Sequence, residues 1–218
     1  MGLFVIGDVH GCYHTLLELM TKWNPEKEIL IQIGDLIDRG LHSAQVVCYF
    51  QDLQKKYGLD KVVVLLGNHE RECIHYVERG SNENWLRFGG QKTLDSFSSE
   101  GVDLRETCEW FKKMPLKWEN ENIFCSHAGI SSNTEDPYNL DTEESVIWTR
   151  SPLLNLGKLQ IVGHTPMRNG QPHFSELNNV WYIDTGAFLR LYLTGMKLQL
   201  DGTLTETLKI HTDSRDLP

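Results

Sequence analysis

Five short polar motifs, each at the end of an apolar run, hold the residues of this chain that are equipped for chemistry. The motifs are Gly7-Asp8-Val9-His10-Gly11, Gly34-Asp35-Leu36-Ile37-Asp38-Arg39-Gly40, Gly67-Asn68-His69-Glu70, Ser126-His127-Ala128-Gly129 and Gly163-His164-Thr165. Together they supply carboxylates, imidazoles and a carboxamide, which are ligand types that hold paired divalent metal ions. A further His–Asp pair and an arginine lie beside those ligands. This combination indicates metal-assisted hydrolysis of a phosphoester.

The apolar runs that precede the motifs predict strands, and helical patterns separate them in the first half of the chain. Strands are expected over residues 3–6, 29–33 and 61–66, and helices over residues 15–22 and 43–56. Strands that alternate with helices favour an α/β fold with a largely parallel sheet. Each motif follows the carboxyl end of a strand, where open α/β sheets place their ligands. We therefore expect motifs that are far apart in sequence to meet at the edge of the sheet where these strands end.

The second half of the chain is richer in strands. Residues 71–120 are expected to be helical with loops. Further strands are expected over residues 123–125, 159–162, 180–183 and 189–194, and a terminal hairpin over residues 197–210. These strands predict a second sheet that packs against the first.

Length and composition set limits on the fold and the partners. A chain of 218 residues is expected to form one domain, residues 1–218. Its formal net charge of −9 argues against binding to a nucleic acid duplex, which depends on Lys and Arg. No apolar run approaches the ~20 residues that a membrane-spanning helix needs, so no membrane partner is expected. The five cysteines form no Cys-x-x-Cys pair and predict buried or half-buried reduced thiols in a cytoplasmic protein.

The motifs, in this order and at this spacing over residues 7–186, resemble the phosphoprotein phosphatase (PPP-type) family of metallophosphoesterases. The resemblance is greatest to the short bacterial and phage serine/threonine phosphatases. A single motif of this kind is weak evidence, but five in order are strong, because chance matches become rapidly rarer. The resemblance implies the calcineurin-like metallophosphoesterase fold, which is α/β with a leaning toward α+β and has two packed mixed β-sheets flanked by helices.

The same resemblance implies two divalent metal ions. Six residues would hold them: Asp8 and His10 on the first ion, Asp35 between the two, and Asn68, His127 and His164 on the second. Only two of these ligands are carboxylates, so even with a bridging hydroxide the centre stays net positive, which suits a dianionic phosphate. The hydroxide would attack the phosphorus in line with the leaving group. Mixed nitrogen and oxygen ligands suit manganese, iron or zinc better than calcium, and do not choose among the three. Manganese is the ion expected, with iron and zinc as alternatives.

Four further residues match catalytic positions of the family. His69 matches the general acid, which would protonate the departing alkoxide and raise the rate roughly 10²–10⁴-fold. Asp38 matches the carboxylate that orients this imidazole and favours its charged form. Arg39 and Arg150 match arginines that hold phosphate oxygens.

Two substrate classes remain open. The full ligand set with Asp38 and His69 favours a phosphomonoesterase that acts on phosphoserine or phosphothreonine in a protein or peptide. Leu66 before the third motif, and Ile130 after the fourth, look more like the diadenosine tetraphosphate hydrolases of the same family. Asp38 and Glu70 differ from the residues usual in those hydrolases. A dinucleotide polyphosphate is therefore the alternative substrate, and residues 71–120 are expected to shape the substrate groove in either case.

The remaining candidates are given structural interpretations. A catalytically silent binding module is disfavoured because each metal-ligand position of the family pattern carries a residue that can bind metal. The histidines outside the motifs are expected at the surface or in loops without metal-binding company: His14, His42, His75, His173 and His211. Packing is expected for Trp85, Trp110, Trp118 and Trp181, and a structural turn for Asp184-Thr185-Gly186. Cys73 and Arg79 have the spacing of cysteine-dependent phosphatases, but the bulky residues between them and the acidic Glu78 do not suit a phosphate-binding loop.

Overall fold

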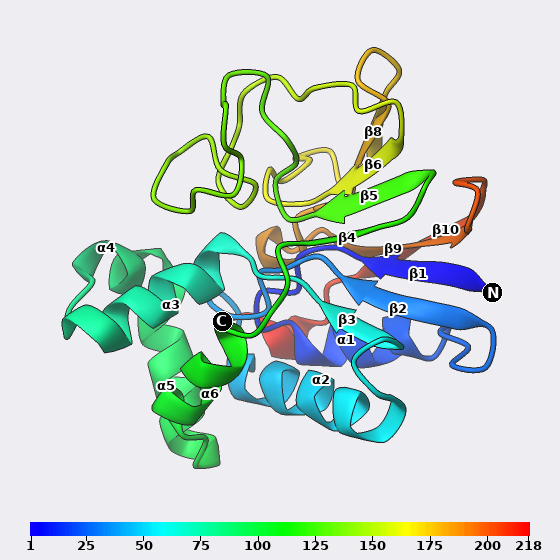
Figure 1. Ribbon diagram of the computed structural model, residues 1–218. Coiled ribbons are helices and arrows are strands. Elements are labelled where there is room, and N and C mark those ends of the chain that lie inside the picture. Colours follow the sequence, from blue (N-terminus) through cyan, green and yellow to red (C-terminus); the bar gives the residue numbers. More distant parts are fainter.

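The apolar runs form two five-stranded mixed β-sheets that pack face to face in the computed structural model, which describes residues 1–218 (Figure 1). In sheet order, the first sheet contains β10 (Leu204–His211), β9 (Tyr192–Gln199), β1 (Gly2–Ile6), β2 (Glu28–Gln32) and β3 (Val62–Val64). The second sheet contains β4 (Lys117–Glu119), β5 (Ile123–Ser126), β6 (Leu159–Val162), β8 (Val180–Tyr182) and β7 (His173–Ser175). The expectation of two packed mixed sheets is confirmed.

Each sheet contains three neighbouring strands that pair in parallel. Strands β1, β2 and β3 pair in parallel, and so do β5, β6 and β8. In the first sheet β10 pairs antiparallel with β9, and β9 with β1. In the second sheet the two edge strands, β4 and β7, pair antiparallel with β5 and β8. The first sheet is therefore mixed, which corrects the expectation of a largely parallel one. The alternating strands and helices of the first half predicted only its parallel part.

The alternation of side chains along β1 divides the hydrophobic core in two. Leu3 and Val5 belong to an inter-sheet core that also contains Ile123 of β5. Phe4 and Ile6 join a larger core on the other face of the sheet, together with apolar residues of the helices. Since successive side chains of a strand face opposite sides, the unbroken apolar run of β1 follows from burial on both faces.

Helices cover the first sheet on the face turned away from the second sheet. These are α1 (Tyr13–Met20) and α2 (Ser43–Tyr57) (Figure 1). A second helical group lies beside the carboxyl ends of the first-sheet strands (Figure 1). It consists of α3 (Asn68–Arg79), α4 (Glu83–Trp85), the kinked turn η1 (Leu86–Gly90), α5 (Gln91–Glu100) and α6 (Leu104–Phe111). None of the helices combines the length and the apolar character that crossing a bilayer requires.

Two short strands were not expected from the sequence. Strand β4 lies inside the segment 71–120, which was expected to be helical with loops, and pairs antiparallel with β5. Strand β7 pairs antiparallel with β8 at the opposite edge of the second sheet. Each has only three residues, and a run of this length carries too little alternation to predict a strand.

The C-terminal hairpin differs from the expectation in its extent and in its partner. Residues 187–189 form a 3₁₀ turn, and β9 begins only at Tyr192, so the expected strand over residues 189–194 is part of the hairpin. The hairpin also joins the first sheet instead of the second, where β9 pairs antiparallel with β1. Met196 and Leu198 of β9 extend the inter-sheet core, and this apolar match favours the observed pairing.

Candidate metal centre

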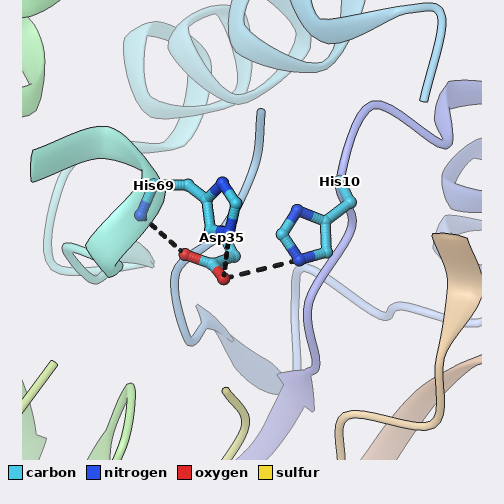
Figure 2. A group of neighbouring side chains, drawn as sticks. All are labelled: His10, Asp35 and His69. Atoms are coloured by element: carbon cyan, nitrogen blue, oxygen red, sulfur yellow. Dashed lines mark hydrogen bonds and ion pairs between the residues drawn. The ribbon is translucent and has the colours of Figure 1, made fainter. Parts of the chain in front are cut away.

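The carboxyl ends of β1, β2, β3, β5 and β6 bring the five motifs together, and Asp35 lies at their meeting point. Asp35 Oδ2 lies 3.4 Å from His10 Nε2 and 3.8 Å from His69 Nε2, as Figure 2 shows. On the other side, Asp35 Oδ1 lies 3.4 Å from His127 Nε2. All four side chains are buried. A carboxylate with imidazoles on both sides is placed where one ligand could serve two ions.

Three electron-pair donors converge on the other side of Asp35. Asn68 Oδ1 lies 2.9 Å from His127 Nε2 and 2.8 Å from His164 Nδ1, and these two nitrogens are 3.2 Å apart. The opposite ring nitrogens carry the protons: His127 Nδ1–H donates to the carbonyl of Ile33, and His164 Nε2–H donates to that of Trp148. Because a carbonyl only accepts, the inward nitrogens of these neutral rings hold lone pairs. Lone pairs aimed at one another repel unless a cation lies among them.

His10 follows the same pattern. Its Nδ1–H donates to the carbonyl of Ile37 at 2.9 Å, which leaves the lone pair of Nε2 facing Asp35. Burial lowers the pKa of His10, His127 and His164, so these rings are neutral at neutral pH. Metal-binding histidines typically have a backbone carbonyl or carboxylate on the nitrogen that faces away from the ion. The three rings therefore have the protonation state and the support that metal binding requires.

Two buried carboxylates next to this cluster have an oxygen without any donor. Asp8 Oδ2 accepts the backbone N–H of His164 at 3.0 Å, whereas Asp8 Oδ1 and Asp184 Oδ2 are buried without a partner. Burial raises the pKa of Asp8, and the charges of Asp184 and Asp35 raise it further. Burial likewise raises the pKa of Asp184 to about 7. Unpartnered buried oxygens are unfavourable, and divalent cations would satisfy them. The residues present therefore fit a metal centre with mixed oxygen and nitrogen donors.

The motif loops adopt backbone conformations that L-amino acids rarely take. The angle φ is positive, between 47° and 74°, at His10, Asp35, Asp38, Arg39 and His164. Only two other non-glycine residues of the chain have a positive φ. Each such conformation costs on the order of 1–3 kcal/mol and persists only where the surrounding structure enforces it. The strain is thus concentrated in the residues that the motifs bring together.

Glu70 connects two of these loops. Its buried carboxylate accepts backbone N–H groups at 2.8–3.3 Å from Asp35, Leu36, Ile37 and Gly67. Burial raises the pKa of Glu70 to about 7, and the charge of Asp35 contributes to the rise. The placement of the Asp35 loop against the start of α3 therefore depends largely on one side chain.

His69 differs from the other imidazoles of the centre. Its Nδ1 lies 2.5 Å from Asp38 Oδ2, and Asp38 is fixed by Trp85 Nε1–H at 2.7 Å and by the Thr93 hydroxyl at 2.6 Å. Burial acts to lower the pKa of His69, but Asp35 and Asp38 outweigh it and raise the pKa. The ring is therefore oriented and biased to carry a proton, which suits an acid better than a metal ligand.

Both arginines predicted from the sequence face one cavity. Arg39 Nη2 lies 3.1 Å from His69 Nε2, and its guanidinium lies over Phe188, with Cζ 3.9 Å from the ring centroid. Arg150 is exposed. These arginines and His69 line a cavity of about 440 Å³. The other residues that line it are Asn68, Glu72, Asn84, Trp85, Phe88 and Trp148.

Every site residue predicted from the sequence lies at this centre or on its cavity, but several others were not predicted. Trp85, interpreted as packing, also donates to Asp38. Asp184, interpreted as a structural turn, places a buried carboxylate beside Asp8. The residues without any functional prediction are Glu70, Thr93 and Phe188. Asp184 follows the carboxyl end of β8 just as the motifs follow their strands, so the sequence did contain a signal for it.

The thiols do not form a rival site. Cys73 and Arg79 both lie in α3, so the segment between them is a helix and not a phosphate-binding loop. Cys73 is buried with its Sγ 3.7 Å from Cys108 Sγ, and this contact, together with burial, raises the pKa of Cys73. The rejection of a cysteine-dependent site is confirmed. Cys48 is exposed, which corrects the expectation that all five thiols are at least half-buried.

Comparisons with known proteins agree with this geometry. Residues 1–195 match a family model described as calcineurin-like phosphoesterase. Serine/threonine-protein phosphatase 1 of Salmonella typhimurium is 26% identical over 211 residues, which cover 90% of this chain and 92% of that protein. A symmetrical bis(5'-nucleosyl)-tetraphosphatase of Shigella dysenteriae is 31% identical over 210 residues, which cover 92% of this chain and 68% of that protein.

Other symmetrical tetraphosphatases match a shorter stretch, about 60% of this chain and 44–45% of their own length. Among solved structures, a protein serine/threonine phosphatase from Saccharomyces cerevisiae superimposes with a TM-score of 0.70 at 15% identity. That superposition covers 98% of this chain and 81% of the yeast chain. At this level of identity the similarity establishes the fold alone.

Proposed function

This chain belongs to the calcineurin-like phosphoesterase family, and we propose that within the family it is a serine/threonine protein phosphatase with a dinuclear metal centre. As a member of the family it is a hydrolase of phosphoesters that uses divalent metal ions. The observation that carries the proposal is the convergence of unprotonated donors from Asn68, His127 and His164 within 3.2 Å of one another. A cation among these donors would relieve the repulsion between their lone pairs.

The ligands divide into two sets that share Asp35. Asp8 and His10 would hold one ion, and Asn68, His127 and His164 the other. Manganese suits these donors, and iron or zinc would also fit. When bound, a pair of divalent ions supplies Lewis acidity, which acidifies water and withdraws charge from the phosphoryl group. All other steps depend on side chains of the chain itself.

The arginines would bind and orient the phosphoryl group. Arg39 is held over Phe188 with its guanidinium beside His69 Nε2, and Arg150 reaches the same cavity from the loop after Trp148. A phosphate that enters the cavity would take the N–H groups of Arg39 in place of His69 Nε2. Two guanidinium groups that meet one phosphate fix its orientation through charge-assisted hydrogen bonds.

Once the phosphate has taken the N–H groups of Arg39, Nε2 of His69 would be free to bind a proton from water, and His69 would then donate that proton to the departing oxygen. Its Nδ1 is bonded to Asp38, so the opposite nitrogen is the one available to the leaving group. The bond to Asp38 stabilises the imidazolium before the proton moves. A serine or threonine alkoxide is a poor leaving group, so protonation by His69 is needed most for such substrates.

The substrate groove would be formed by segments outside the motifs. Asn84, Trp85 and Phe88 line the cavity from the segment 71–120, and Trp148 lines it from the second half of the chain. Phe88 is largely exposed, with 69% of its surface accessible, so it is free to contact a substrate. We treat residues 1–218 as a single metallophosphoesterase domain. We also place the protein in the cytoplasm, because all five cysteines are free thiols.

A dinucleotide polyphosphate is the second candidate substrate. The Shigella tetraphosphatase has the higher identity, 31% against 26% for the Salmonella phosphatase. The length of the match favours the phosphatase, since it covers 92% of that protein but 68% of the tetraphosphatase. Leu66 and Ile130, which suggested the tetraphosphatases, are both buried and do not line the cavity. We therefore rank the phosphoprotein first.

Paired turnover measurements test this order. The protein, loaded with Mn²⁺, is assayed on a phosphothreonine peptide and on diadenosine tetraphosphate, and kcat/KM is compared. The proposal requires the larger value for the peptide. A larger kcat/KM for the dinucleotide would assign the protein to the second function. If neither of these substrates nor an aryl phosphate is turned over, the protein is a binding module and not an enzyme. An Asp35→Asn variant purified identically controls for contaminating phosphatases.

A further inference from the structure

A second cluster of metal-ligand side chains lies outside the catalytic centre. One ligand atom each from His14, His42 and Asp216 lies within 4.8 Å of the others. His14 is in the first turn of α1, His42 immediately precedes α2, and Asp216 is in the C-terminal turn η3 (Ser214–Asp216). The expectation that His14 and His42 have no metal-binding company is therefore wrong. It arose because His42 and Asp216 are 174 positions apart in the sequence, and only the fold brings them together.

The carboxylate of Asp216 is buried and held in a fixed orientation. Its Oδ1 accepts the backbone N–H of His14 at 2.8 Å. Its Oδ2 accepts the backbone N–H of Thr15 at 2.9 Å and the Thr15 hydroxyl at 2.6 Å. An ionised carboxylate offers about four lone-pair positions, two on each oxygen. Oδ1 therefore retains a lone pair after its single hydrogen bond.

The two imidazoles complement this carboxylate. His42 Nε2–H donates to the carbonyl of Arg215 at 2.9 Å, and since a carbonyl only accepts, Nδ1 of His42 carries the lone pair. His14 makes no side-chain hydrogen bond, and its ring meets that of His42 edge to face, with centroids 5.0 Å apart. Both rings are half-buried. His42 thus has the same backbone-carbonyl support as His10, His127 and His164.

We propose that His14, His42 and Asp216 form an additional metal site, separate from the catalytic centre, for a divalent transition ion such as Zn²⁺. Two imidazole nitrogens and one carboxylate oxygen are a common protein donor set for such ions, with water completing the shell. Mg²⁺ and Ca²⁺ prefer oxygen donors and are poor occupants. The half-buried ring of His14 makes no side-chain hydrogen bond and can turn to close on an ion, while His42 and Asp216 stay fixed by theirs.

An ion at this site would fasten the C-terminal segment to the loops of the catalytic centre. The backbone N–H of Leu41 donates to the carbonyl of Asp216 at 2.9 Å, and that of Gly40 donates to the carbonyl of His10 at 3.0 Å. Arg39, which faces the catalytic cavity, directly precedes Gly40. The site is therefore structural in character, and its occupancy raises the thermal stability of the chain.

The test is metal content by equilibrium dialysis against Zn²⁺, with elemental analysis of the dialysed protein. The wild-type chain is expected to retain one more Zn²⁺ than the His14→Ala/His42→Ala double variant. A His173→Ala/His211→Ala double variant, which loses two exposed histidines elsewhere, is the matched control and should retain as much as the wild type. If the first double variant does not fold, the single variant His42→Ala replaces it.

A second readout separates this site from the catalytic one. The Asp35→Asn/His127→Ala variant, which is altered at the catalytic centre, should still show a Zn²⁺-dependent rise in Tm, and adding the changes at His14 and His42 should abolish it. Equal Zn²⁺ content in the wild type and in folded His14→Ala/His42→Ala would overturn the inference, as would an unchanged Tm response. Neither result bears on the proposed phosphatase function, because these histidines are outside the catalytic cavity.

Discussion

The Nδ1 atom of His69 lies 2.5 Å from the Oδ2 atom of Asp38, and this contact sets His69 apart from the other imidazoles around Asp35. His10, His127 and His164 each donate a proton to a backbone carbonyl, and burial lowers their pKa. His69 faces a carboxylate instead, and its pKa is raised. One cluster of histidines therefore contains three neutral rings suited to bind metal and one ring suited to donate a proton, and the partner on the outer nitrogen distinguishes them.

The variant His69→Asn should separate these two roles. We expect kcat for a phosphoserine peptide to fall roughly 10²–10⁴-fold, because protonation of the leaving group is lost. The fall should be much smaller for an aryl phosphate, whose leaving group is already stable as an anion. Metal content, measured by elemental analysis, should stay at the wild-type level. Equal losses on both substrates would remove the role of general acid from His69.

The variant Trp85→Phe tests whether Trp85 is a positioning residue for the acid. It removes the N–H that Trp85 donates to Asp38 at 2.7 Å. Loss of a hydrogen bond to a buried charged group should lower the free energy of unfolding by about 1–3 kcal/mol. Less precise placement of His69 should also lower kcat on the phosphoserine peptide by up to about 10²-fold.

The matched control is Trp110→Phe, which removes a comparable N–H. That group donates to Gln54 Oε1 at 3.0 Å, away from the catalytic cavity. We expect this variant to lose some stability, measured by urea unfolding, and to keep its kcat. If both variants lose kcat to the same extent, the effect of Trp85→Phe is general loosening and not the placement of Asp38.

Glu70→Gln tests the connection between the Asp35 loop and the start of α3. A carboxamide has one acceptor oxygen in place of two, so it cannot satisfy all the backbone N–H groups that Glu70 accepts. We expect a loss of about 1–3 kcal/mol in the free energy of unfolding and weaker retention of metal on dialysis. Glu78→Gln is the control, since exposed Glu78 has only a surface ion pair with Lys112. A Glu70 variant as stable as this control would contradict the assigned role.

The sequence predicted the meeting of the candidate ligands, because each of them follows an apolar run that forms a strand. Asp8, Asp35, Asn68 and His127 all lie just after the carboxyl end of a strand, and sheet geometry brings them together. The edge of the sheet that the terminal hairpin would join could not be predicted. A period of two residues shows that a strand is amphipathic or buried, but it does not identify the strand with which it pairs.

The support for Asp38 was equally hard to predict, because it depends on one close backbone approach. Gly89 has a φ of 130°, and a Cβ there would lie 2.6 Å from the backbone nitrogen of Arg39 and 2.9 Å from Asp38 Cβ. Only glycine permits this approach, which brings the segment with Trp85 and Thr93 against the Asp38 loop. A glycine in a segment expected to be helical gives no indication of what it will contact.

Anomalous scattering from crystals soaked in Mn²⁺ tests the dinuclear centre itself. We predict two manganese peaks on either side of Asp35, one bound by Asp8 and His10 and the other by Asn68, His127 and His164. A single map would thus check every ligand at once. Peaks confined to other parts of the chain, with the Asp35 carboxylate bound to no ion, would contradict the proposed centre and the chemistry that depends on it.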